Sequence, residues 1–406
     1  MTEILAGTLL FTLIVVALGL VVIGVRAVVL PSRRVAVVVN GSQPIAAMTG
    51  SSLLNVLNEA GVPVPSACAG AGTCGLCRVR VTKGGGDPSP TELSRLSRTE
   101  AREGMRLACQ VGVRGDLEVE VAPDLLNVEA FTCTVHAIRP LSPLIREIVL
   151  DLPEGQAFDA RAGAFVQVTA PAYSLRYADI EVADAHRAAW DRMGLADVVA
   201  GSDAPVSRAY SLANRPEDKN RVVLFIRLAV PPPSEPHAPP GIVSSWLFGL
   251  KPGDKVEVSG PYGDFGANDS DREMVLIGGG VGMAPLRAII HDQLERVGTT
   301  RKISFWYGAR SRIDLFYADA FDDLAARYPN FSWTAALSDP TPDDAWTGPT
   351  GFIHKVAYTS YLKTHPAPET CEYYLCGPPL MIQAVLGMLD ECGVDDDSIF
   401  NDDFGS

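Results

Sequence analysis

Four cysteines are spaced as the ligands of an iron-sulfur centre would be. Cys68, Cys74 and Cys77 lie in one short loop and Cys109 follows later, giving the pattern C-x5-C-x2-C-x31-C. Thiolates from one tight loop and one distant residue suit a 2Fe-2S cluster, and the small residues between them let backbone N–H groups approach the sulfurs. A structural zinc site is the alternative, although zinc sites more often pair two C-x2-C knuckles. The spacing therefore predicts a 2Fe-2S cluster held by these four residues.

A second candidate site is the Arg-Ala-Tyr-Ser motif at residues 208–211. Period-two alternation would place Arg208 and Tyr210 on one face of a strand. The motif resembles the R-x-Y-S of the ferredoxin reductase family, and the resemblance implies bound FAD. In that case Tyr210 stacks on the isoalloxazine, Arg208 pairs with the pyrophosphate and Ser211 hydrogen-bonds near N5. The alternative is an ordinary barrel strand with an exposed arginine.

Two later motifs favour the flavin. Gly241, Ser244 and Ser245 open a predicted helix, and a helix N-terminus with small residues is a phosphate site. Residues 260–265 then match the G-P-x-G-x-F turn that closes the barrel in the same family. The order of the three motifs predicts a flavin-binding barrel.

A glycine-rich loop follows a strand predicted at residues 273–277. Gly278, Gly280 and Gly282 lead to Pro285 in the first turn of a helix predicted through residue 294. A strand, a glycine loop and a helix N-terminus form a phosphate cradle, here in the form G-x-G-x-x-P. This arrangement predicts a nucleotide-binding site.

The turn Cys376-Gly377-Pro378-Pro follows a later predicted strand. In the ferredoxin reductase family this turn brings the nicotinamide to the flavin, so Cys376 is a candidate for the hydride path. A buried thiol that fills space is the alternative role. Phe404 occupies the position where relatives place an aromatic ring over the flavin, and the alternative is a frayed tail.

The elements around the cysteines have the order of a β-grasp. A strand at residues 35–40, a helix at 53–61, the cysteine loop, and strands at 78–82 and 117–121 follow one another. This order resembles that of ferredoxins. It predicts an α+β domain that ends near Pro123.

Short alternating runs at residues 132–138, 145–150, 165–169 and 222–229 predict an antiparallel β-barrel around the flavin motif. Residues 177–203 form an insertion between two of its strands. Further strands at 302–308, 331–337 and 372–375 alternate with helices, which predicts a parallel α/β sheet with its ligand at the strand C-terminal ends. The fold class is therefore multidomain.

The N-terminus carries a candidate membrane anchor. Residues 4–25 contain no charge and no proline, as a bilayer-spanning helix requires. A cleaved signal peptide is the alternative, but Glu3 replaces a basic leader and no A-x-A-like site follows. Arg26, Arg33 and Arg34 predict a single-pass helix with the bulk of the chain in the cytoplasm.

Composition excludes one class of partner. With a net charge of -14 and a pI near 4.9, the chain lacks the clustered Lys and Arg that nucleic acid requires. Eight cysteines are too few for a disulfide scaffold in a chain of this length, and Cys133, Cys371 and Cys392 are predicted to be buried thiols. Preference for NADH over NADPH is not fixed by the residues, because Arg310 stands where it could meet a 2'-phosphate.

Taken from the anchor through three cofactor domains, and including the insertion, the chain resembles the F subunits of the Na+-translocating NADH:quinone oxidoreductases. The resemblance implies that NADH gives a hydride to FAD, that FAD passes single electrons to the 2Fe-2S cluster, and that the cluster reduces partner subunits on the way to ubiquinone. Its implied location is the bacterial inner membrane, with other membrane subunits and the lipid bilayer as partners.

The predicted domains are an anchor (residues 1–30), a ferredoxin-type domain (31–125), an FAD-binding barrel (128–268) and an NAD-binding domain (269–406). A soluble NADH-dependent reductase component of a bacterial oxygenase shares the last three and is the alternative function. A tethered electron carrier or zinc-binding module without turnover is the alternative from another class.

Overall fold

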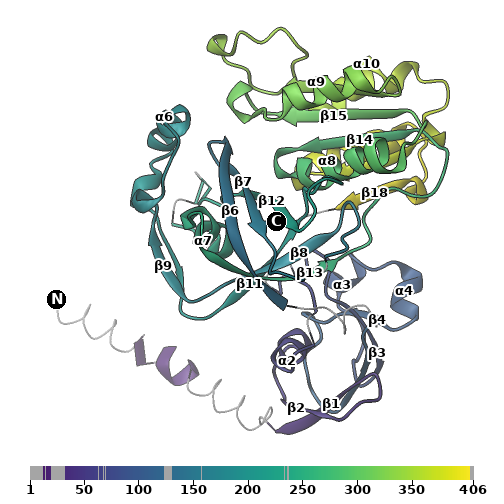
Figure 1. Cartoon of the computed structure of the whole chain (residues 1–406). Helices are drawn as coiled ribbons and strands as arrows, with labels where there is room; N and C mark the ends of the chain where they lie inside the picture. Colours follow the sequence, from purple (N-terminus) through teal and green to yellow (C-terminus); the bar gives the residue numbers. More distant parts are fainter. Residues whose placement is uncertain are drawn as a thin grey trace. The chain divides into compact units, whose positions relative to one another are not determined.

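The computed structural model describes residues 12–13, 15–19, 33–62, 64–66, 68, 70–122, 130–156, 158–232, 234–235 and 237–402 of the chain (Figure 1). The chain divides into two compact units. The first comprises Met1–Val64 and Gly70–Asn127, and the second comprises Pro65–Ala69 and Val128–Ser406.

The first unit is a mixed sheet in the order β2-β1-β5-β3-β4, with β1 and β5 parallel. Helix α2 begins after Ser52, whose side chain accepts a hydrogen bond from the N–H of Asn55, and its Leu53 and Leu57 are fully buried. The predicted strands and helix are confirmed. The elements are β1 (Arg34–Val39), β2 (Ile45–Met48), α2 (Leu53–Glu59), β3 (Arg78–Lys83), α3 (Pro90–Leu93), α4 (Arg98–Arg102), β4 (Met105–Leu107) and β5 (Leu117–Glu120).

The predicted membrane anchor at residues 4–25 lies for the most part outside the described residues. Residues 12–13 and 15–19 are helical. Within the described part of the chain, no helix is both long and apolar enough to cross a bilayer.

The second unit begins with an antiparallel barrel in the strand order β11-β8-β13-β6-β7-β12, which a bridge between Leu212 and Leu224 closes. Alternate residues of its strands point inward and form one apolar core, while helix α7 packs on it. The barrel elements are β6 (Ala130–Ser142), β7 (Ile145–Asp151), β8 (Phe165–Ala170), β11 (Val206–Ser211), β12 (Arg221–Arg227), α7 (Ile242–Gly249) and β13 (Lys255–Tyr262).

The insertion at residues 177–203 is folded onto the barrel. It contains α6 (Asp184–Met193), and its β10 (Val199–Ser202) pairs with β9 (Tyr173–Arg176). Tyr177 and Trp190 are buried in the barrel core, and the Trp190 indole N–H donates to the carbonyl of Pro143 at 2.7 Å. The insertion therefore contributes to the barrel interior.

The rest of the second unit is a parallel sheet in the order β16-β15-β14-β17-β18 with helices on both faces. The helix predicted through residue 294 is observed: α8 ends at His291 and continues directly as a π-helix over Asp292–Val297. The elements are β14 (Met274–Gly279), α8 (Met283–His291), β15 (Ile303–Ala309), α9 (Ala318–Arg327), β16 (Phe331–Leu337), α10 (Ile353–Ser360), β17 (Glu372–Cys376), α11 (Pro379–Glu391) and β18 (Ile399–Asp402).

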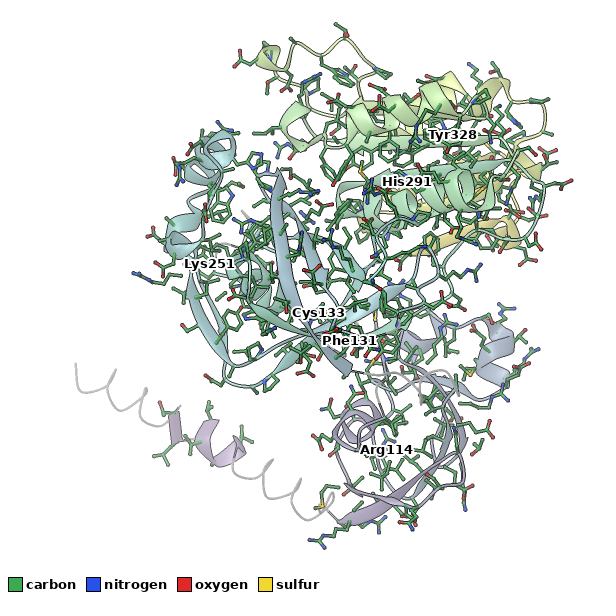
Figure 2. All side chains as sticks on the ribbon, viewed as in Figure 1. Arg114, Phe131, Cys133, Lys251, His291 and Tyr328 are labelled. Atoms are coloured by element: carbon green, nitrogen blue, oxygen red, sulfur yellow. The ribbon has the colours of Figure 1, made fainter. Side chains whose placement is uncertain are left out.

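Two of the three predicted buried thiols are buried. Cys133 on β6, labelled in Figure 2, is 0% exposed, and burial raises its pKa to about 12. Cys371 is also buried. The prediction is wrong for Cys392, which is half-buried because it lies just beyond the end of α11.

Candidate functional site

The cysteine loop has the backbone that closely spaced thiolates need. Gly70, Gly72 and Gly75 all have positive φ (88°, 80° and 69°), a region that residues with a Cβ rarely adopt. A Cβ at Gly72 would come within 2.9 Å of the Gln110 side chain. Only glycine therefore fits this loop at that position.

The surroundings of the loop fit a group that accepts hydrogen bonds. The Gln110 amide donates to the carbonyl of Gly70 at 2.9 Å and lies 3.6 Å from Cys109 Sγ. Thr73 Oγ1 is buried and has no hydrogen-bond partner among the described residues. A buried hydroxyl without a partner is costly, and the sulfur atoms of a bound cluster would satisfy it.

Three of the predicted ligands, Cys74, Cys77 and Cys109, lie in the first unit. Cys77 is fully buried and the other two are half-buried. Cys68 lies in the segment Pro65–Ala69, which groups with the second unit. The assignment of all four cysteines as ligands stays a prediction.

The predicted flavin motif lies on β11, which pairs with β8. Arg208 is opposite Val168 and Tyr210 opposite Val166, so both side chains share one face as the alternation required. Tyr210 packs against the barrel core, and burial raises its pKa, so its phenol stays neutral. The Arg208 guanidinium donates to the carbonyl of Ser207 at 2.8 Å, and burial lowers its pKa.

Helix α7 packs near this strand with an open N-terminus. It begins after Gly241 without a side-chain cap, and a Cβ on Gly241 would lie 2.6 Å from Ala229 Cβ. The hydroxyls of Ser244 and Ser245 both donate to the carbonyl of Gly241, and Ser245 Oγ also lies 2.7 Å from the Tyr177 hydroxyl. The first-turn backbone N–H groups are the donors that suit a phosphate, since the serine hydroxyls are already engaged.

The predicted glycine loop and the C-G-P-P turn meet at the carboxyl edge of the parallel sheet. The strands that follow β14 in sequence add first on one side of it (β15, β16) and then on the other (β17, β18). Nucleotides bind at such a switch point, which here lies between β14 and β17. A Cβ on Gly282 would lie 2.0 Å from the carbonyl oxygen of Cys376, and one on Gly377 would lie 3.0 Å from that of Gly279. The two loops therefore touch through their backbones. Gly280 has a φ of +58°, and Pro285 lies in the first turn of α8 as predicted.

A hydrogen bond joins this edge to the flavin strand. In the sheet register Cys376 lies between Gly278 and Asp402. Ser211 at the end of β11 donates to Asp402 Oδ2 at 2.9 Å. The hydrogen bond thus connects Ser211 to β18, the strand in which Asp402 pairs with Cys376.

The comparisons with known proteins match each part of this arrangement. Residues 37–114 match the 2Fe-2S iron-sulfur cluster binding domain, residues 195–266 the oxidoreductase FAD-binding domain and residues 276–386 the oxidoreductase NAD-binding domain. The chain is therefore an oxidoreductase with domains for a 2Fe-2S cluster, FAD and NAD.

Full-length relatives decide the family. The chain is 48% identical over 403 residues to the F subunit of the Na(+)-translocating NADH-quinone reductase of Neisseria meningitidis serogroup C, covering 99% of this chain and 100% of that protein. It is 49% identical over 405 residues to the F subunit of the same reductase in Yersinia pseudotuberculosis, with the same coverage. The chain belongs to this family of F subunits.

Solved structures with lower identity share the architecture. The cytochrome P450 reductase GcoB of Amycolatopsis is 28% identical with a TM-score of 0.62, over 91% of this chain and 98% of that one. The ferredoxin reductase in carbazole 1,9a-dioxygenase is 25% identical with a TM-score of 0.58, over 92% and 99%. Because the NADH-quinone reductase relatives are far closer in sequence, the family assignment is favoured over the alternative of an oxygenase reductase.

One functional candidate, Asp402, was not predicted from the sequence. Asp402 belongs to β18, a short strand near the C-terminus that was not predicted. The apolar pair Ile399 and Phe400 was the feature of the sequence that could have indicated this strand. Phe404 lies outside the described residues. Arg310, a candidate for a 2'-phosphate, instead forms an exposed ion pair with Asp339 at 3.2 Å.

One cluster in the NAD-binding domain looks like a metal site but is better explained by hydrogen bonds. Among the described residues, Glu273, His365 and Cys371 place their ligand atoms within 4.8 Å of one another. The N–H of Ala367 donates to His365 Nδ1, so the proton lies on Nε2, which faces Glu273 at 3.3 Å. Lys302 Nζ lies 3.5 Å from the same carboxylate. A protonated nitrogen and a nearby cation both oppose a metal ion.

Proposed function

We propose that this chain is the NADH-oxidising, membrane-anchored subunit of a Na+-translocating NADH:ubiquinone reductase. Bound FAD would accept the hydride of NADH and release single electrons to the 2Fe-2S cluster, from which partner subunits carry them to ubiquinone. The observation that supports this most directly is the Ser211–Asp402 hydrogen bond beside Cys376, because it joins the flavin strand to the nicotinamide edge. The Neisseria and Yersinia relatives are named as subunits of an NADH-quinone reductase, and this supports a quinone as the final electron acceptor.

The barrel residues position the flavin. Tyr210 presents an aromatic face, Arg208 presents a cation to the pyrophosphate, and Ser211 reaches the reacting edge through a hydroxyl oriented by Asp402. The N-terminus of α7, with Gly241 and the residues Ser244 and Ser245 behind it, offers N–H groups to a phosphate.

The nucleotide domain positions NADH. The loop that contains Gly278, Gly280 and Gly282 accepts the nucleotide phosphates against α8, where Pro285 occupies the first turn. Cys376, Gly377 and Pro378 are the residues proposed to place the nicotinamide against the flavin, and Phe404 is the residue proposed to lie over the flavin.

The cluster domain and the anchor complete the proposal. Cys68, Cys74, Cys77 and Cys109 hold the cluster. Residues 4–25 form a single membrane-spanning helix in the bacterial inner membrane, with the cofactor domains in the cytoplasm. We place the domain boundaries at residues 1–30, 31–125, 128–268 and 269–406. Tethering keeps the cluster close to its membrane partners at an effective concentration of order millimolar.

The test separates the two cofactor centres. Cys74→Ala should abolish the iron-sulfur absorbance but keep bound FAD and NADH oxidation with an artificial acceptor, because the cluster loop and the barrel have separate cores. Cys392→Ala, at a half-buried thiol outside the loop, is the matched control and should keep both. A normal cluster signal in Cys74→Ala would overturn the ligand assignment.

The anchor is tested by removing residues 1–30. The truncated protein should be soluble and oxidise NADH with an artificial acceptor, since every cofactor motif follows Pro31. It should lose nearly all electron delivery to quinone in depleted membranes. Full restoration of quinone reduction at low protein concentration would show that the anchor is dispensable.

A further inference from the structure

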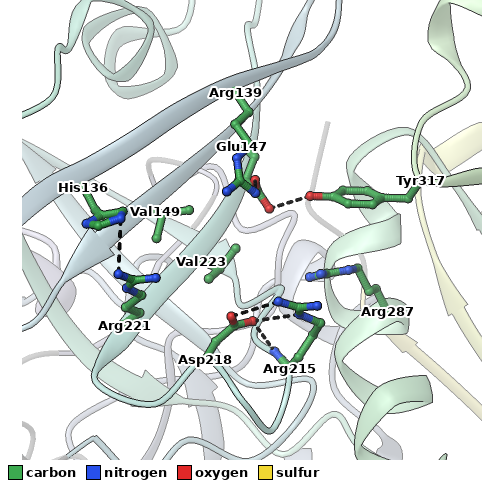
Figure 3. Close-up of a pocket in the computed structure, with 10 residues that line it drawn as sticks. All are labelled: His136, Arg139, Glu147, Val149, Arg215, Asp218, Arg221, Val223, Arg287 and Tyr317. Atoms are coloured by element: carbon green, nitrogen blue, oxygen red, sulfur yellow. Dashed lines mark hydrogen bonds and ion pairs between the residues drawn. The ribbon is translucent and has the colours of Figure 1, made fainter. Parts of the chain in front are cut away.

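A polar cavity of about 150 Å³ lies in the second unit, away from the flavin strand (Figure 3). One wall is the outer face of the barrel, including Val149 and Val223. The other wall carries Arg287 of α8 and Tyr317, which precedes α9. Val149 and Val223 pack with residues of α8, whereas Tyr210 packs on the barrel interior. The cavity is therefore distinct from the proposed flavin site.

Most of the cations around this cavity already have carboxylate partners. Arg139 donates to Glu147 at 2.9 Å, and the other oxygen of Glu147 accepts a hydrogen bond from the Tyr317 hydroxyl at 2.6 Å. Arg215 pairs with Asp218 at 3.3 Å.

The same is true of Arg221, which donates to Asp151 at 3.0 Å and lies 3.2 Å from His136 Nε2. These contacts hold the guanidinium groups in place beside the cavity. Figure 3 draws the contacts of Arg215 with Asp218 and of Arg221 with His136.

Arg287 is the exception. Its side chain is 5% exposed, yet among the described residues it forms no ion pair and a single hydrogen bond, from NH1 to the carbonyl of Ala213. The guanidinium carbon lies 4.8 Å from the centre of the Tyr317 ring and 5.7 Å from that of Phe225. The remaining N–H donors have no partner in the described part of the chain, although Arg287 lines the cavity.

A buried guanidinium with unused donors requires compensation. Removing a charge from water is costly unless an opposite charge and hydrogen bonds replace the water. Aromatic rings supply part of that compensation, but they accept none of the N–H groups in the guanidinium plane. A planar fork of donors suits a phosphate oxygen pair.

The geometry points to a binding site for a phosphate group in this cavity, held by Arg287 and by Arg139, Arg215 and Arg221, which line the same cavity. Such a ligand bridges the barrel and the nucleotide domain, because Arg287 belongs to α8 and the other three belong to the barrel or its loop. Bound phosphate therefore stabilises the contact between these two parts of the second unit.

The experiment is a thermal titration of the full-length holoprotein with inorganic phosphate at constant ionic strength, set with KCl. Saturating NAD+ keeps the nucleotide site filled. Because a ligand that binds only the folded state stabilises it, saturating phosphate should raise Tm by roughly 2–4 °C. No rise in Tm as phosphate replaces KCl at this constant ionic strength would overturn the proposal.

Variants assign the effect to the cavity. Arg287→Met should weaken the apparent phosphate affinity by about tenfold or more, which corresponds to the loss of a charge-assisted contact. Arg139→Gln should weaken it less, and this variant decides the matter if Arg287→Met does not fold, because the Arg139 side chain is 64% exposed. Arg176→Gln removes an exposed, carboxylate-paired arginine elsewhere on the unit and should leave the phosphate response unchanged. A wild-type response in both cavity variants would overturn the proposal.

The source of the phosphate group is distinguished by a second probe. Glycerol 3-phosphate, a phosphate monoester without a nucleobase, is titrated in the same way. A larger Tm shift than that of inorganic phosphate, lost in the cavity variants, identifies an organic phosphate as the ligand. A larger shift with inorganic phosphate identifies the free ion.

Discussion

Two buried arginines, Arg106 in the first unit and Arg287 in the second, differ in how many of their N–H donors have a hydrogen-bond partner among the described residues. Arg106 forms a two-pronged pair with Glu92, from Nε to Oε1 at 2.7 Å and from NH2 to Oε2 at 2.9 Å. Its NH1 donates to the carbonyls of Gly85 and Gly86. Arg287 has one hydrogen bond and no carboxylate among the described residues.

The difference separates two uses of a buried charge. Glu92 is 0% exposed, and its carboxylate also accepts the N–H groups of Ser89 and Leu107, so the pair is complete within the protein. This complete pair ties helix α3 to strand β4 and leaves no free hydrogen-bonding group for a ligand. A buried arginine without a carboxylate partner, such as Arg287, is stabilised only where another group supplies the missing hydrogen-bond acceptors.

The largest effect is expected from breaking the complete pair. Glu92→Ala leaves Arg106 as a buried charge without a carboxylate and should cost about 3–5 kcal/mol of the free energy of unfolding. Urea unfolding of the full chain, followed by the cluster absorbance, measures this. Glu103→Ala removes an exposed carboxylate that pairs with Arg80 at 3.6 Å and should cost at most about 1 kcal/mol. Equal losses in the two variants would mean that burial of the pair is unimportant.

The same pair should make the first unit sensitive to acid. Burial on its own raises the pKa of Glu92, but the hydrogen bonds from Arg106, Ser89 and Leu107 together lower it below the ordinary 4.5. A lowered folded pKa contributes stability that is fully present above 4.5 and is lost as pH falls through the folded value. The stability difference between wild type and Glu92→Gln should therefore shrink as the pH falls from about 4.5 to about 3. A difference that is constant over this range would contradict the assignment.

Much of this fold could be predicted because local patterns and tertiary packing agree. The alternation around Arg208 and Tyr210 gave the correct face of β11, and the glycine loop gave the correct strand edge. The helix after Ser89 was missed, although Ser89 and Glu92 form a capping box whose S-x-x-E signature is readable in the sequence.

Other features depend on contacts between distant segments, which no local pattern encodes. Asp402 acts through a hydrogen bond to Ser211, 191 positions away. The pocket around Arg287 needs residues from the barrel and from the nucleotide domain, and its arginines look in the sequence like ordinary surface charges. Motifs that carry their own backbone geometry can be recognised in the sequence, whereas sites assembled from separate elements cannot.

Replacement of Arg287, the buried arginine without a carboxylate partner, should have a small effect on stability. Arg287→Met loses one hydrogen bond and the ring contacts, but it also relieves the cost of a buried cation. In phosphate-free buffer the free energy of unfolding should change by no more than about 1 kcal/mol. Guanidinium unfolding in chloride measures it. A loss as large as that expected for Glu92→Ala would show that Arg287 is a structural charge like Arg106.

The smallest effect on stability, and a clear effect on function, is expected at an arginine that is paired but exposed. Arg310 and Asp339 follow β15 and β16 at the carboxyl edge of the nucleotide sheet, with side chains 77% and 68% exposed. An exposed pair contributes at most about 1 kcal/mol, so Asp339→Asn should leave Tm almost unchanged. The carboxylate neutralises Arg310 and would repel a 2'-phosphate, whereas without it the guanidinium is released to bind one. The ratio of kcat/KM for NADPH to that for NADH should therefore rise by about tenfold, mainly through a lower KM for NADPH.

The double variant Asp339→Asn with Arg310→Gln should return the ratio towards wild type. If Asp339→Asn alone left the ratio unchanged, the pair would play no part in the choice of coenzyme, and the preference for NADH would have to come from other residues along this edge.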